Sequence, residues 1–373
     1  MKRLLAIALL FLVILVFGWQ LWPEEPTTPT SYAGLGESTD EFRQAQPGTV
    51  LRFPEDHGPH PDYRIEWWYL TANLAAKDGR HFGAQWTLFR QAMAPSDPQP
   101  GANETPWASR QLWMAHAALS TPEDHRFSER FARGGVGQAG VKTKPFDAWI
   151  DNWSLKTVDD KSGFERLVVT AGGEDFGYRL NLDAQGPLVR HGEQGFSQKS
   201  ADGQGSMYYS QPFFQVSGEV WVDGEPITVT GRAWLDREWS SQLLGPTQSG
   251  WDWFSLHLDS GAKLMAFRLR GGGETGKEES YLSGSWITPK GEIMPLKPNE
   301  LSLEPREYQS VVGREVPTRW RIQVPDHDLD VEVRARHSNQ WMNTSFPYWE
   351  GMVEVSGSND GEGYLEMTGY ADE

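Results

Sequence analysis

Three carboxylates and several tryptophans crowd into one stretch of the chain, residues 231–258. Asp236 and Glu238 lie two positions apart in the segment Ala-Trp-Leu-Asp-Arg-Glu-Trp-Ser-Ser, so on a strand they would share one face with Trp234. Carboxyl groups among tryptophans cost free energy unless they are paired or take part in chemistry. This stretch is therefore the first place to look for a functional site.

Acid chemistry is one use for such residues. A carboxylic acid that an apolar wall keeps protonated could donate its proton to an alkene. Flanking tryptophan rings would stabilise the resulting cation, and water would then quench it. We therefore predict Asp236 and Glu238 as the catalytic acids of an enzyme. The structural alternative is an ion-pair clasp, in which Arg237 or a neighbouring arginine satisfies both acids and locks two domains together.

Candidate ligand contacts lie on other segments with strand-like patterns. Glu66 would share a strand face with Trp68, although a buried glutamate paired to a nearby arginine is the commoner arrangement. Gln85 and Arg90 come from one strand and are expected to face the same lumen. His116 lies in an apolar segment, as either a core histidine or a general base. The predicted ligand-binding residues are Glu66, Trp68, Tyr69, Gln85, Arg90, His116, Tyr209 and Trp253.

The elements that would position these residues are strands. Residues 64–74 are rich in β-forming side chains, Asp78-Gly79 is a strong turn dipeptide, and residues 81–90 form the return strand of a hairpin. Alternation of apolar and polar residues recurs at 176–182 and in later segments up to residue 370. One short helix is expected at 123–133, stopped by two glycines. The pattern predicts an all-β protein.

Two pairs of segments resemble each other, which indicates an internal repeat. Residues 67–90 match residues 251–270, because each begins with a tryptophan-rich strand and continues through a glycine turn. Residues 218–233 match residues 351–371, and each contains a Thr-Gly strand. The simplest fold is two tandem antiparallel β-barrels, with domains at residues 49–235 and 236–373. Chance similarity between hairpins is the alternative.

Several segments also resemble a known family. They include His60-Pro-Asp-Tyr-Arg-Ile-Glu-Trp-Trp-Tyr69, Gly83-Ala-Gln-Trp-Thr-Leu-Phe-Arg90 and Gly363-Tyr-Leu-Glu-Met-Thr-Gly-Tyr370, together with the acidic stretch at 231–241. By these segments the chain resembles the lipocalin-like carotenoid 1,2-hydratase and AttH-like family. The resemblance implies two lipocalin-like barrels with a ligand cleft in or between them. Members include alkene hydratases, pericyclase-like fungal relatives and exported bacterial proteins, so no single activity is implied.

The N-terminus predicts export. Lys2 and Arg3 precede an apolar run at residues 4–22, which has the order of a signal peptide and is just long enough to span a bilayer. Residues 1–22 are therefore either a cleaved signal peptide or a retained membrane anchor, followed by a Pro-rich linker at 23–48. In both cases we expect the folded body to be periplasmic or held at the outer side of the inner membrane.

Composition and motifs exclude several classes of function. A net charge of −17 without a basic tract argues against nucleic-acid binding, and the absence of cysteine removes disulfides and thiol catalysis. No metal and no cofactor are predicted, because His57 and His60 lack a carboxylate frame and the Gly135–Gly140 motif does not lie in a βαβ unit. No G-x-S-x-G motif supports a serine hydrolase.

Three hypotheses for function remain. The first is an exported protein that binds a hydrophobic small molecule of lipid or isoprenoid character in an aromatic-lined pocket. The second is a hydratase or isomerase, resembling the carotenoid hydratases as a hydro-lyase, that uses Asp236 or Glu238 as its acid. The third is an accessory partner of a membrane transport complex with no ligand of its own. A perturbed acid in a cleft between the barrels would favour the enzyme over the binding protein.

Overall fold

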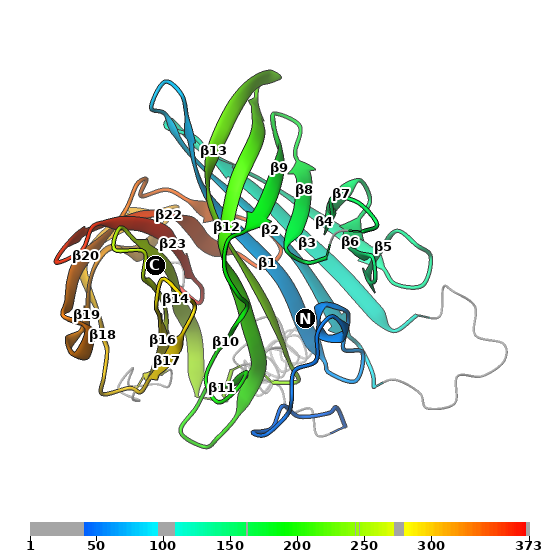
Figure 1. Cartoon of the computed structure of the whole chain (residues 1–373), viewed down its shortest axis with the longest axis horizontal. Helices are drawn as coiled ribbons and strands as arrows, with labels where there is room; N and C mark the ends of the chain where they lie inside the picture. The colour runs from blue at the N-terminus through cyan, green and yellow to red at the C-terminus, as the bar shows by residue number, and fades with distance from the viewer. Residues whose placement is uncertain are drawn as a thin grey trace, which may run out of the picture. The chain divides into compact units, whose positions relative to one another are not determined.

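The computed structural model describes residues 41–95, 109–161, 163–242, 244–245, 247–271 and 280–370. Most of these residues form β-strands. The short 3₁₀ helix η2 (Glu55–His57) precedes the first strand, and η4 (Pro325–His327) lies between two later strands. The strands make two antiparallel sheets (Figure 1). The predicted signal peptide or anchor at 1–22 lies outside the described residues. Within the described residues, no helix has the length and apolar character needed to cross a membrane.

The first sheet has 13 strands in the order β4-β3-β2-β1-β13-β12-β9-β8-β7-β6-β5, with β10 and β11 also paired to β12. Its strands are β1 (Ile65–Ala76), β2 (His81–Ala92), β3 (Gln111–Ser120), β4 (His125–Arg133), β5 (Ala139–Thr143), β6 (Phe146–Ile150), β7 (Trp153–Thr157), β8 (Arg166–Gly172), β9 (Phe176–Ala184), β10 (Val189–Arg190), β11 (Phe196–Gln198), β12 (Gly205–Val222) and β13 (Glu225–Ser240).

The second sheet has 10 strands in the order β17-β16-β15-β14-β23-β22-β20-β19-β18, with β21 also paired to β22. Its strands are β14 (Gln248–Leu258), β15 (Lys263–Gly271), β16 (Tyr281–Ile287), β17 (Ile293–Leu296), β18 (Ser302–Val311), β19 (Arg314–Val324), β20 (Leu329–Ala335), β21 (Trp341–Met342), β22 (Tyr348–Gly357) and β23 (Gly361–Met367).

Both sheets follow one plan. Each pairs its first strand with its last long strand, β1 with β13 and β14 with β23, in agreement with the internal repeat. Figure 1 shows the second sheet curled into a nearly closed barrel and the first sheet as a more open half-barrel. The prediction of an all-β fold with two antiparallel, lipocalin-like barrel sheets is confirmed.

Two sequence-based details need correction. The predicted domain boundary at 235/236 falls inside β13, which stays hydrogen-bonded to β1 and β12 as far as Ser240 and Trp239 respectively. The change from one sheet to the other comes later, between Ser240 and Gln248. The helix expected at 123–133 is wrong, because residues 125–133 form strand β4. That segment completes its backbone hydrogen bonds against β3, a tertiary partner that overrides local propensity.

Each sheet has its own apolar core on its inner face. In the first sheet this core includes the fully buried Trp68 and Trp86, and in the second it includes Trp320 and Trp349. Because successive strand residues point to opposite faces, filling the inner faces with apolar side chains leaves a second set of residues on the outer faces. Those outer faces carry part of the candidate functional residues.

Candidate functional site

The outer faces of the two sheets meet in a buried polar region, which we call the inter-sheet layer. Tyr69 points away from the first core and donates a hydrogen bond to Oε1 of Glu350 on β22 at 2.7 Å. Trp253 of β14 donates to the hydroxyl of Tyr208 on β12 at 3.2 Å. The sheets are therefore joined by hydrogen bonds between buried side chains as well as by apolar contacts.

The structure separates the predicted site residues into two groups. The group in the inter-sheet layer is Tyr69, Gln85, His116, Trp253, Asp236 and Glu238. The group on the opposite face of the first sheet is Glu66, Trp68, Arg90 and Tyr209. The expectation that Gln85 and Arg90 face one lumen is wrong. They are five positions apart on β2, and an odd separation places them on opposite faces.

A pair of carboxyl groups that sequence analysis missed lies in this layer. Glu350 of β22 and Glu366 of β23 are directly opposite in the antiparallel register, so both side chains leave the sheet on one face. Burial, reinforced by the charge of Glu366, raises the pKa of Glu350 well above its usual range. Burial also raises the pKa of Glu366 to about 7. The pair therefore keeps a proton near neutral pH.

The sequence contains a pattern that indicates one member of this pair, Glu350. Tyr348, Glu350 and Met352 alternate with Trp349 and Gly351, so a strand would place the acid on one face with an aromatic residue. The same reasoning selected Asp236. What the alternation could not show is that Glu366 lies opposite Glu350, because register depends on the pairing of two strands.

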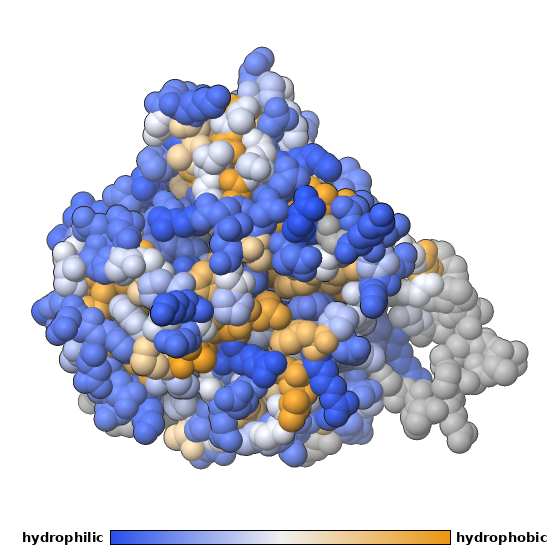
Figure 2. All heavy atoms as spheres, viewed as in Figure 1, coloured by the Kyte–Doolittle hydropathy of each residue, from blue (hydrophilic) through white to orange (hydrophobic). Residues whose placement is uncertain are grey.

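Aromatic side chains surround the carboxyl pair and lead from it to the surface. The indole N–H of Trp251 donates to Glu366, and the rings of Tyr69 and Trp253 meet edge to face at 5.4 Å. Four partly exposed aromatic residues border this part of the layer, and we call them the aromatic rim: Trp67, Phe89, Trp251 and Phe346. The molecular face in Figure 2 is mostly hydrophilic, with apolar residues interspersed.

Asp236 shares a face with Trp234, as the alternation predicts. It accepts hydrogen bonds from Ser210 and Trp234 on Oδ1 and from Tyr208 on Oδ2. Burial raises the pKa of Asp236 to about 7, although these three donors favour the carboxylate. Both of its oxygens are thus already engaged.

Glu238 lies on the same face, where it is paired with a buried lysine. Lys199 Nζ is 3.0 Å from Glu238 Oε1, and Ser206 donates to the same oxygen. The lysine also lies 4.2 Å from the ring centroid of Phe267 on β15. Arg237, which the clasp hypothesis named as the partner of these acids, points to the other face and pairs with Glu66 instead. Glu238 is therefore held by an ion pair with Lys199 and not by an arginine.

His116 links the two sheets. Its Nε2 lies 3.0 Å from Oε1 of Glu129 on β4, and its Nδ1 lies 2.9 Å from the hydroxyl of Tyr348 on β22. Burial lowers the pKa of His116, although the neighbouring Glu129 acts in the opposite direction. Gln85 Nε2 in turn lies 3.3 Å from the Tyr348 hydroxyl.

Some buried polar atoms of the layer have no hydrogen-bond partner within the part of the chain that the structure describes. They include Oε2 of Glu350, Oε1 of Gln85, Oδ1 of Asn73 and both ring nitrogens of His257. Buried polar groups are nearly always hydrogen-bonded, so these atoms mark positions for water or for polar groups of a ligand. Among the described residues, no group of three or more histidine and acidic side chains is placed to hold a metal.

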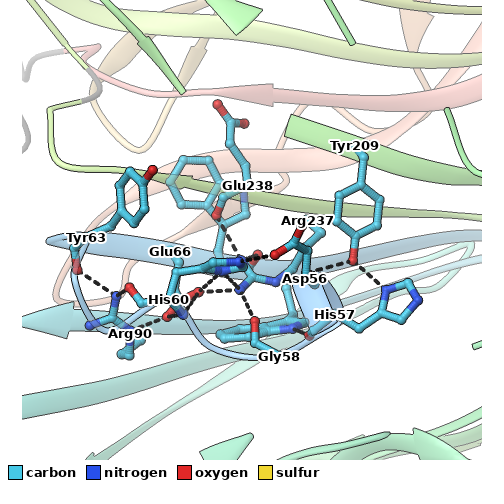
Figure 3. Close-up of polar contacts among 12 residues, drawn as sticks. Asp56, His57, Gly58, His60, Tyr63, Glu66, Arg90, Tyr209, Arg237 and Glu238 are labelled. Carbon is cyan, nitrogen blue, oxygen red and sulfur yellow. Dashed lines mark hydrogen bonds and ion pairs between the residues drawn. The ribbon is translucent and has the colours of Figure 1, made fainter. Parts of the chain in front are cut away.

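The second group of predicted residues forms an ion cluster on the inner face of the first sheet (Figure 3). Glu66 is completely buried and is bound by Arg90 through Oε1 and by Arg237 through Oε2. Burial alone would raise the pKa of Glu66, but the two guanidinium charges outweigh it and hold that pKa far below its usual range. The cluster is an ion-pair clasp of the kind weighed for Glu66 from sequence.

The same cluster fixes the segment that precedes β1. Arg90 donates to the carbonyl oxygen atoms of His60 and Tyr63 at 2.8 and 2.7 Å, and Arg237 donates to that of Gly58 at 2.6 Å. The predicted ligand contacts Trp68 and Tyr209 also bind this segment. Trp68 donates to the carbonyl oxygen of His57, and the Tyr209 hydroxyl is 2.7 Å from the His57 ring. These contacts are structural.

We predict that Glu66→Gln destabilises the protein by about 3–5 kcal/mol, because it leaves two buried arginines without their anion. Urea unfolding followed by tryptophan fluorescence measures the loss. Asp78→Asn is the control, since it removes an exposed partner of Arg80 and should leave the midpoint almost unchanged. Equal midpoints for Glu66→Gln and the wild type would contradict the structural role of Glu66.

A second prediction concerns pH. Unfolded, Glu366 loses its proton near its ordinary pKa of 4.5, whereas the folded protein retains that proton up to about pH 7. The folded state therefore binds more protons in this window, and the contribution of Glu366 to stability falls as pH rises through it. Glu366→Gln should flatten this part of a pH profile of unfolding midpoints. Glu304→Gln, an exposed change, should not. An unaltered slope in Glu366→Gln would refute the raised pKa.

Comparison with known proteins identifies the family. Residues 44–370 match the model of the AttH-like family. No curated protein matches the chain. A crystal structure from Nitrosomonas europaea that is assigned to AttH is similar, with 33% identity, a TM-score of 0.76, and coverage of 88% of this chain and 100% of that one.

Two more distant structures share the fold alone. Kievitone hydratase of Nectria haematococca has 14% identity and a TM-score of 0.63, and the match covers 89% of this chain and 98% of that one. CghA with Sch210972 has 11% identity and a TM-score of 0.54, with coverage of 91% and 98%. The family match spans most of the chain and includes both sheets. The protein therefore belongs to the AttH-like family.

Proposed function

We propose that the inter-sheet layer is an acid site that protonates an alkene in an apolar small molecule and adds water to it. The Glu350–Glu366 pair carries this proposal. It keeps a proton near neutral pH, where a general acid is most effective, and its Glu350 Oε2 has no hydrogen-bond partner among the described residues. A protonated acid beside aromatic rings is what alkene protonation requires.

The proposed reaction is balanced within the layer. The π electrons of the alkene take the proton of the Glu350–Glu366 pair, which forms a C–H bond and leaves a carboxylate and a carbocation. The faces of Trp251 and Trp253 stabilise the cation. Water then bonds through its oxygen to the cation and returns one proton to the carboxylate. If the cation instead loses a proton from a neighbouring carbon to the carboxylate, the product is an isomerised alkene and the acid is restored.

Asp236 and Glu238 become supporting residues in this proposal. Asp236 already accepts three hydrogen bonds, and Glu238 is paired with Lys199, so neither has an oxygen as available as Oε2 of Glu350. Their negative charge, when present, would stabilise a cation in the layer. The catalytic role that the sequence assigned to β13 therefore moves to β22 and β23.

Binding of a hydrophobic ligand without turnover is the second candidate function. The aromatic rim and the buried polar atoms of Gln85 and Asn73 favour it, since ligand sites combine apolar walls with a few orienting polar groups. We also propose that the folded body acts outside the cytoplasm, supported by Lys2, Arg3 and the apolar run that follows. A membrane transport complex is the partner that we propose for that location.

The test of hydration is incubation of the purified protein with acyclic isoprenoid alkenes in heavy-oxygen water, followed by mass spectrometry. We expect a product that has gained one water with its labelled oxygen. Glu350→Gln and Glu366→Gln should each lower the rate by about a hundred-fold or more, because each removes one carboxyl group of the proton-donating pair. Asp236→Asn should have a smaller effect.

Glu354→Gln is the matched control, because Glu354 is an exposed acid on the same strand as Glu350. It should leave the rate unchanged. Equal rates for the Glu366 and Glu354 variants would contradict the acid role. Quenching of tryptophan fluorescence by the alkene without any labelled product would replace the enzyme with the binding protein.

A further inference from the structure

We infer that protons move between solvent and the inter-sheet layer through Glu129, His116 and Tyr348, which we call the proton relay. The first sheet supplies Glu129 on β4 and His116 on β3, and the second sheet supplies Tyr348 on β22. The relay rests on the proposed function only for its purpose, which is to bring the acid pair to its protonated state from solvent before substrate binds, since water returns the proton within each turnover. Its existence can be tested without any substrate.

The hydrogen bonds give the relay a direction. An ionised carboxylate only accepts hydrogen bonds, so His116 Nε2 carries the hydrogen that points to Glu129. Nδ1 of the neutral ring is then an acceptor, and the Tyr348 hydroxyl donates to it. The phenol hydrogen and the imidazole hydrogen therefore point the same way, from the layer toward Glu129.

Proton transfer along this chain needs no movement of heavy atoms. In the outward direction, Tyr348 passes its proton to Nδ1, the proton on Nε2 passes to Glu129, and Tyr348 regains a proton from the layer. Outward transfer leaves the ring hydrogen on Nδ1, and inward transfer then runs as the reverse and restores it to Nε2. Burial lowers the pKa of His116, so its ring is neutral between transfers and available to accept a proton. Glu129 and Tyr348 are the titratable groups that contact it.

The outer end of the relay reaches water. The Glu129 side chain is 19% exposed, whereas His116 is completely buried. Ser345 donates to Glu129 from its backbone N–H and its hydroxyl, and these bonds together with His116 lower the pKa of Glu129 despite partial burial. Glu129 is thus a carboxylate at neutral pH that can collect a proton from solvent and release it.

The inner end of the relay lies beside the acid pair. Tyr348 and Glu350 are two residues apart on β22 and share one face of that strand. Gln85 of the first sheet lies 3.3 Å from the Tyr348 hydroxyl through Nε2, and its Oε1 and Glu350 Oε2 have no hydrogen-bond partner among the described residues. One bound water or one ligand hydroxyl at this point would join Tyr348 to Glu350.

The experiment is a stopped-flow pH jump that follows tryptophan fluorescence. Trp251 donates to Glu366, so its emission should report protonation of that carboxyl. The kinetic phase to be analysed is the fluorescence change that the wild type shows and Glu366→Gln lacks. We expect His116→Gln and Tyr348→Phe to slow this phase by about ten-fold or more. Imidazole in the buffer should restore the rate in His116→Gln but not in Tyr348→Phe.

Glu129→Gln provides a variant at the exposed end, where folding is less at risk, and it should slow the phase as well. His125→Gln is the matched control, because His125 is a partly buried histidine on the same face of β4 as Glu129 that contacts Ser120 instead of Tyr348. Three results would overturn the relay. They are an unchanged rate in the relay variants, an equally slow rate in His125→Gln, and a slow rate in His116→Gln that imidazole does not restore. Failure of alkene hydration alone would overturn only the proposed function.

Discussion

Polar side chains are buried between two sheets that already have apolar cores of their own, and this constraint governs the rest of the structure. Tyr69 with Glu350 and Tyr208 with Trp253 join the outer faces of the two sheets. A carboxyl group in such a place is costly when charged and alone. It must either find a cation or keep its proton, and buried carboxyl groups of this protein do both.

A glutamate that finds a cation has a structural role, whereas a glutamate that keeps its proton can act as an acid. Glu66 is bound by two arginines and is held as an anion, so it serves to fix the segment before β1. Glu350 and Glu366 face each other, and burial raises the pKa of both. Buried glutamates of this protein are thus a structural anion at Glu66 and a potential proton donor at Glu350 and Glu366.

The sequence predicted a large part of the fold. Alternation and turn dipeptides identified the all-β class and the repeat of two antiparallel sheets, because both signals are local or recur along the chain. It also placed Asp236 and Trp234 on one face, and the structure agrees. Errors arose where a tertiary partner decided the outcome: the helix expected at 123–133 is strand β4, and β13 extends past the predicted boundary at 235/236.

The sequence by itself therefore determined which neighbouring residues share a strand face, since a strand has a period of two. Only the tertiary structure decided which acids acquire a cation and which acquire another acid. Tyr69 and Glu350, which are 281 positions apart, meet because the outer faces of two sheets pack together. Glu350 meets Glu366 through strand register. Charge state depends on such distant neighbours and on burial, and neither can be read from local pattern.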